Sequence, residues 1–106
     1  MMMTDQQIIE TLATKVMGWR YIEGHGFFEG HEIELSQGFE WNPLQNIADA
    51  WMLVDKIGPF DYRKSPIRIG GGYQHITEFF YHGHWYSGEG KTVHEAICQA
   101  ALKTVA

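Results

Sequence analysis

Apolar residues recur at helical spacing in three stretches of the chain, each bounded by start and stop signals. The central stretch, 46–57, begins at Asn46, a residue type that caps helices, and ends before Gly58-Pro59. Its apolar positions fall on one helical face: Ile47, Ala50, Trp51, Val54 and Ile57. We therefore predict a helix that buries this face, with Trp51 in the core.

The other two helices have similar signals. Thr4 and Gln7 have the spacing of a capping box for a helix over about 5–17, which Gly18 ends. Thr92 and Glu95 predict a second capping box, at the start of the last helix. Small residues dominate the apolar face of that helix, which favours close packing: Val93, Ala96, Ile97, Ala100, Ala101 and Thr104 or Val105.

Alternating apolar and polar residues predict three antiparallel strands between the second and third helices. The first covers 60–63 and 66–70, with Ser65-Pro66 placing it at a sheet edge or bulge. The second covers 73–81, and His82-Gly83 forms a two-residue hairpin loop before the third, 84–87. We expect Gly88-Glu-Gly90 to end the sheet.

The region 20–38 lacks periodicity and is rich in glycine, so we expect a long loop that can hold one short ribbon. Only 27–28 and 33–35 have an ordered pattern. Long connections in compact domains are often functional, which makes this loop a first place to look for a ligand.

These elements predict an α+β fold in which three helices pack with a small three-stranded antiparallel sheet, in the order α-loop-α-β-β-β-α. The length, 106 residues, suits one domain over 1–106, and 44% hydrophobic residues indicate a globular chain. The three methionines at the start fit a start-site or cloning feature better than a structural one.

Charge and cysteine content restrict the partners and the compartment. With 8 Lys plus Arg against 13 Asp plus Glu, the net charge of −5 disfavours nucleic acid. Cys98 is the single cysteine, so no intramolecular disulfide can form, and no apolar run reaches the ~20 residues of a membrane span. We expect a protein of a reducing cytoplasm, with no membrane association.

Three blocks of sequence carry a family resemblance: Val16-Met-Gly-Trp19, Trp41-Asn-Pro-Leu-Gln-Asn-Ile-Ala-Asp-Ala-Trp51 and Glu95-Ala-Ile-Cys-Gln-Ala-Ala-Leu102. Together they resemble the phage ABA sandwich domain family, small proteins of bacteriophages and prophages. The resemblance spans most of the chain, and 20–38 and the glycine-rich hairpin lie outside it. It implies helices on either side of a small sheet, with no established activity and no catalytic residue.

The order of elements over 46–105 is also similar to that of a double-stranded RNA-binding domain. Such domains carry a lysine cluster at the start of the last helix, where it meets phosphates. Here these positions are Thr92, Val93, His94 and Glu95, with only Lys91 nearby, so we interpret the similarity as shared topology.

Candidate chemistry is sparse. His75, His82 and His84 are weak metal candidates, since no ligand motif accompanies them, and Cys98 lies in an alanine-rich helical stripe typical of a core thiol. Gly90-Lys91-Thr92 at a helix start could hold an anion, and exposed rings near cations suit a protein interface or a stacked base. The candidate ligand-binding residues are Arg63, Arg68, Tyr81, Trp85, Lys91 and Thr92.

From the resemblance we expect a non-enzymatic accessory protein of a phage or prophage, which acts in the cytoplasm of the host bacterium. Counter-defence against the host is one role that such a protein could have. It would bind a host protein or a small nucleotide-like ligand held at a homo-oligomer interface, without a cofactor. The edge strand near 60–69 and the hairpin 81–86 would form that interface. The alternatives are a nucleic-acid-binding module and a small metal-dependent hydrolase using His75, His82 and His84 with Glu78.

Overall fold

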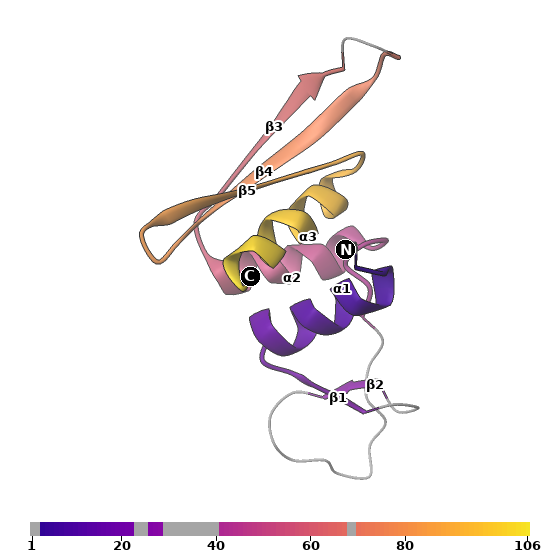
Figure 1. Ribbon diagram of the computed structural model, residues 1–106, viewed down its shortest axis with the longest axis vertical. Coiled ribbons are helices and arrows are strands. Elements are labelled where there is room, and N and C mark those ends of the chain that lie inside the picture. The colour runs from indigo at the N-terminus through magenta and orange to yellow at the C-terminus, as the bar shows by residue number, and fades with distance from the viewer. Residues whose placement is uncertain (1–2, 23–25, 29–40, 68–69) are drawn as a thin grey trace.

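A computed structural model describes residues 3–22, 26–28, 41–67 and 70–106, and Figure 1 shows its architecture. The fold is α+β, as predicted, with the elements α1 (Asp5–Thr11), η1 (Leu12–Val16, a π-helical turn), β1 (Arg20–Ile22), β2 (Gly26–Phe28), α2 (Ile47–Ile57), β3 (Phe60–Pro66), β4 (Tyr73–Tyr81), β5 (His84–Gly90) and α3 (Val93–Thr104).

The main sheet has the strand order β3-β4-β5, and both pairs are antiparallel. His82 (φ 49°) and Gly83 (φ 82°) form the predicted two-residue hairpin loop, and positive φ at both positions is the signature of a type I′ turn. β3 runs without interruption through Ser65 to Pro66, so the predicted break there is wrong. Pro66 fits at this position because β3 is an edge strand.

The described helices lie on one side of the main sheet (Figure 1), whereas the family resemblance implies helices on both sides. In Figure 1, α3 lies directly against the sheet, α1 lies farther away, and the small β1–β2 ribbon lies at the far end. Thr77 of β4 donates from Oγ1 to the carbonyl of Ala96 in α3 at 2.7 Å and is fully buried. The strand register places its neighbours Tyr62 and Gly88 on the same face, which we call the helix face.

The core contains buried residues of α1, η1, α2, β4 and α3 together with Trp19 and Trp41, and capping contacts define where the helices begin. The predicted capping box of Thr4 and Gln7 is present, and the Asn46 side chain accepts from the amides of Ala48 and Asp49. At α3, Thr92 accepts from the Glu95 amide, but the Glu95 carboxylate accepts from the Lys91 amide, so this box is only half formed.

Trp51 is not a core residue, contrary to the sequence prediction. Its side chain is 47% exposed and packs edge-on against Phe60, with ring centroids 5.6 Å apart. The buried face of α2 is formed by Ala50, Leu53 and Ile57 instead. Helical spacing alone could not choose between these faces, because apolar residues surround most of α2.

Gly88-Glu-Gly90 does not end the sheet, because β5 continues through Gly90. A Cβ on Gly88 would lie 2.1 Å from the Ala100 backbone nitrogen, and one on Gly90 would lie 2.8 Å from the Ala96 nitrogen. These glycines are therefore packing residues that let α3 approach the strand closely.

In the region 20–38, a short antiparallel ribbon forms from β1 and β2, while 33–35 lies outside the described residues. No helix within the described part of the chain is long and apolar enough to cross a membrane.

Candidate functional site

The face of the main sheet turned away from the helices, which we call the outer face, carries two exposed aromatic side chains. Phe80 is 39% and Trp85 58% exposed, and their ring centroids lie 5.2 Å apart. They are cross-strand partners in the β4–β5 register, and Ile76 lies on the same face four residues along β4. Exposed apolar side chains that are grouped in this way are typical of interaction surfaces.

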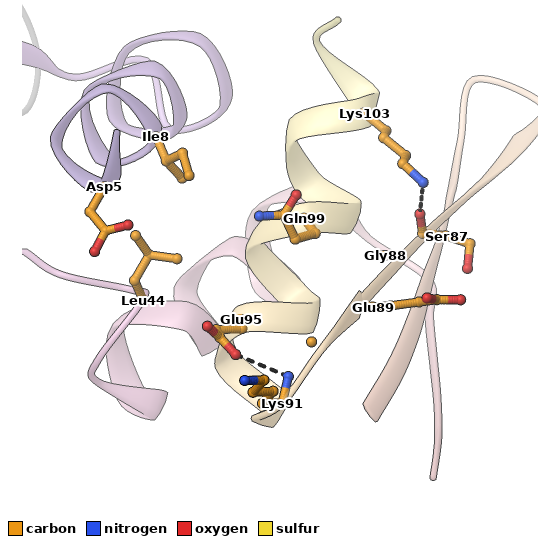
Figure 2. Close-up of a pocket in the computed structure, with 11 residues that line it drawn as sticks. Asp5, Ile8, Leu44, Ser87, Gly88, Glu89, Lys91, Glu95, Gln99 and Lys103 are labelled. Carbon is orange, nitrogen blue, oxygen red and sulfur yellow. Dashed lines mark hydrogen bonds between the residues drawn. The ribbon is translucent and has the colours of Figure 1, made fainter. Parts of the chain in front are cut away.

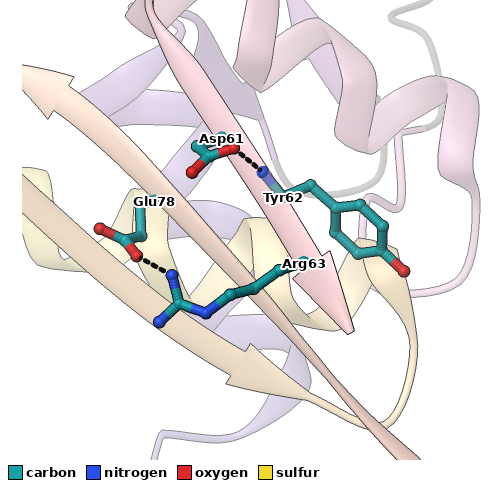
Figure 3. Close-up of polar contacts among 4 residues, drawn as sticks. All are labelled: Asp61, Tyr62, Arg63 and Glu78. Carbon is teal, nitrogen blue, oxygen red and sulfur yellow. Dashed lines mark hydrogen bonds and ion pairs between the residues drawn. The ribbon is translucent and has the colours of Figure 1, made fainter. Parts of the chain in front are cut away.

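Polar side chains occupy the rest of the outer face. Figure 3 shows the ion pair between Arg63 of β3 and Glu78 of β4. The Gln74 amide donates to the Glu89 carboxylate at 2.7 Å. Because these pairs are solvent-accessible, each contributes little to stability, and the surface is free to exchange them for contacts with a partner.

A groove of about 490 Å³ runs along the edge of β5 that does not pair with β4 (Figure 2). A row of α3 side chains, Glu95, Gln99 and Lys103, lines it at a spacing of four residues. The second wall is β5 itself, and the third is formed by Asp5, Ile8 and Leu44. Consecutive β5 residues, 87–90, line the groove, as the edge of a strand does, whereas a strand face would present every second residue.

The backbone of β5 has free hydrogen-bonding groups along this edge. Tyr81 and His84 flank a two-residue hairpin loop, so they bond to each other, and bonding alternates along the ladder. The N–H and C=O groups of Trp85, Ser87 and Glu89 therefore point away from β4. The Lys103 ammonium donates to the Ser87 carbonyl, which confirms the direction at that residue.

The structure divides the candidate ligand-binding residues between these surfaces. Arg63 and Trp85 share the outer face, and their partners on β4, Ile76 and Phe80, are four residues apart. Lys91 lines the groove. Thr92 caps α3, and Tyr81 lies half-buried on the helix face, while Arg68 is outside the described residues. The described five do not converge on one site.

The histidine candidates also lie apart. His75 is six residues before Tyr81 on β4, roughly 20 Å along the strand, and the Tyr62 hydroxyl lies 2.6 Å from its Nδ1. His82 and His84 are at the exposed hairpin tip. Within the described ranges, no three His, Cys, Asp or Glu side chains are grouped closely enough to hold a metal ion.

Cys98 is fully buried in α3. Burial raises the pKa of its thiol to about 12, and the Glu95 carboxylate adds to the rise. A nucleophilic cysteine needs the opposite shift, so this thiol is a core residue, as its position in the alanine stripe predicts.

Sequence reasoning missed Gln99, Lys103 and the β5 edge. Gln99 and Lys103 were missed because they occur among ordinary helix-forming residues. The β5 edge was missed because its glycines, Gly88 and Gly90, are typical of the end of a strand. The available signal was the spacing of four between Glu95, Gln99 and Lys103, which places them in one row of α3.

Comparisons with known proteins agree with this fold. The family model described as the phage ABA sandwich domain matches residues 10–102. The chain is also similar to a phage protein from Bacillus cereus ATCC 14579 of known crystal structure, with 25% identity and a TM-score of 0.68, over 99% of this chain and 90% of that one. No curated protein matches significantly. With the matched model covering most of its length, the chain belongs to the phage ABA sandwich domain family.

Proposed function

We propose that this phage protein acts without catalysis, by binding a protein of the host bacterium through the outer face of its main sheet. The observation that carries the proposal is the exposed Phe80–Trp85 ring pair on a sheet face that no described helix covers. Aromatic side chains are enriched in the cores of protein interfaces, where they bury large areas at little entropic cost.

The contacts at the start of α3 favour a protein over the nucleotide-like ligand. A phosphate would bind free amides at the helix start, and two amides there are already used, since the Glu95 carboxylate accepts from the Lys91 amide and the Thr92 hydroxyl accepts from the Glu95 amide. The nearby carboxylates of Asp5 and Glu95 would also repel an anion.

A nucleic-acid-binding function has less support than protein binding. The order α2-β3-β4-β5-α3 matches the double-stranded RNA-binding topology. However, Lys91 is the one lysine in 88–97, and the outer face carries Asp61, Glu78 and Glu89 against Arg63. Phosphate contacts supply most of the affinity of such domains, so this charge distribution opposes the function.

Self-association and a counter-defence role are part of the same proposal. The outer face spans three strands of about seven residues, roughly 14 by 23 Å. Since a standard interface buries about 800 Å² on each partner, a stable homodimer would need the β3 edge or the hairpin as well.

Photo-crosslinking in host cells tests the proposal. A benzoylphenylalanine at position 85 is compared with one at 73, because Tyr73 is also 58% exposed but lies on the helix face. We expect position 85 to give a discrete adduct with a host protein, identified by mass spectrometry, which position 73 does not give and which Phe80→Ser abolishes. An adduct formed only with a second copy of this chain would overturn the proposal. Equal adducts from both positions, or none from position 85, would overturn the proposal.

A further inference from the structure

The groove beside β5 combines a free strand edge with a row of polar helix side chains. Ser87 and Glu89 direct their N–H groups into it, and Glu89 also directs its carbonyl there. The side-chain amide of Gln99, which is half-buried on α3, has no hydrogen-bond partner among the residues that the structure describes. Such a site offers both backbone bonds and a side-chain donor and acceptor to one ligand.

We propose that this groove binds an extended polypeptide segment of a partner protein, which adds to β5 as a fourth strand. Backbone groups two residues apart, as at Ser87 and Glu89, match the repeat of a strand. The edge from Trp85 to Glu89 would pair with about five residues, or roughly 16 Å of strand. The proposal goes beyond the outer face, since the groove lies on the other side of β5.

A second copy of this chain does not fit the same edge in the register that places Gly88 opposite Gly88. Paired strands lie about 4.8 Å apart, whereas packed helices need about 8–10 Å between their axes. Because α3 crosses directly over Gly88, pairing β5 with β5 would bring two copies of α3 to roughly 5 Å at the crossing. A single strand without a helix avoids this clash.

The charges of the groove are balanced. The carboxylates of Asp5 and Glu95 line it against the ammonium groups of Lys91 and Lys103, and Lys103 is already bonded to the Ser87 carbonyl. The groove therefore recognises the segment mainly through its backbone and through the Gln99 side-chain amide. Lys103 itself protects the edge, since charged side chains commonly block strand edges, and it must leave Ser87 when the strand binds.

The test uses a displayed library of random nine-residue peptides, selected on the full chain. Affinities of the enriched peptides are then measured by fluorescence anisotropy. Glu89→Pro removes an N–H that points into the groove, and we expect it to weaken binding at least ~10-fold. Lys64→Pro is the matched control, because Lys64 has the equivalent outward position on the opposite edge, and it should change nothing.

Two measurements keep the test valid if Glu89→Pro fails to fold. Single N-methylation along a selected peptide should abolish binding to the unmodified protein at alternate positions, because alternate amides face β5. Lys103→Met should tighten binding about three- to tenfold, since the Ser87 carbonyl becomes free.

No enriched peptide, or uniform tolerance of N-methylation, would overturn the proposal. Phe80→Ser separates this groove from the proposed function: peptide affinity should be unchanged, while the crosslink at position 85 should be lost. A loss of both would contradict the assignment of two separate surfaces.

Discussion

A Cβ placed on Gly88 would lie 2.1 Å from the backbone nitrogen of Ala100, closer than any real contact permits. This approach brings α3 onto β5, and the row Glu95, Gln99 and Lys103 of α3 then forms one wall of the groove. The geometry of the groove therefore depends on a residue without a side chain.

Gly88→Ala is expected to destabilise the protein by about 3 kcal/mol or more, because the added methyl group meets backbone atoms that cannot rotate away. Urea denaturation followed by circular dichroism measures the free energy of unfolding. Glu89→Ala, an exposed change in the same strand, should stay within about 0.5 kcal/mol of the unmodified protein. Similar values for the two variants would contradict the close packing of α3 on β5.

Leu53→Ala should destabilise the protein more than Trp51→Ala, although tryptophan is the larger residue. Leu53 is fully buried, so its truncation leaves a cavity and costs about 2–5 kcal/mol. Trp51 is half exposed and loses mainly its contact with Phe60, which we expect to cost about 2 kcal/mol or less. Thermal unfolding of the two variants decides the order, and the reverse order would return Trp51 to the core.

The stability contributed by Cys98 should be lost at high pH. Burial raises the pKa of the folded thiol to about 12 from an ordinary 9.0. Below pH 9 both states hold the proton, but between pH 9 and 12 only the unfolded chain releases it, so ionisation favours unfolding there. Cys98→Ala removes this contribution.

Urea titrations of both proteins from pH 8 to 11 give the comparison. The unmodified protein should lose more stability than Cys98→Ala as the pH rises, while lysines and tyrosines affect both equally. Parallel curves would show that the thiol ionises as freely in the folded state as in the unfolded one.

We expect a homodimer or larger assembly at micromolar concentration, with the β3 edge and the hairpin at the interface. Tyr62 of the β3 edge and Trp85 of the hairpin are exposed there. Light scattering measures the mass, and Trp85→Ser should shift it toward one chain. A mass of 12.2 kDa for the unmodified protein at all concentrations would exclude self-association.

Protein purified without a histidine tag should contain far less than one zinc ion per chain. His75 lies roughly 20 Å along β4 from the two histidines of the hairpin tip, so the three cannot share a metal ion within one chain. Elemental analysis checks this, and a stoichiometric result would favour the hydrolase alternative.

Local sequence signals predicted most of the secondary structure. Asn46 begins α2, Thr4 and Gln7 cap α1, and His82-Gly83 closes the β4–β5 hairpin, because each signal acts through its own backbone neighbours. The family resemblance likewise predicted the α+β fold, which the structure and the matched family model support.

Only the tertiary structure decided which residues became surface and which became packing. The face of α2 that turns inward depends on the elements packed against it, and in the fold Leu53 is buried while Trp51 lies half exposed beside Phe60. Gly88 stands in a sequence that is typical of a turn, but it is a packing residue. Its sequence neighbours do not indicate that a Cβ at this position would lie 2.1 Å from the backbone of α3. The groove joins α1, β5 and α3, segments up to about a hundred residues apart, so no local pattern could predict it.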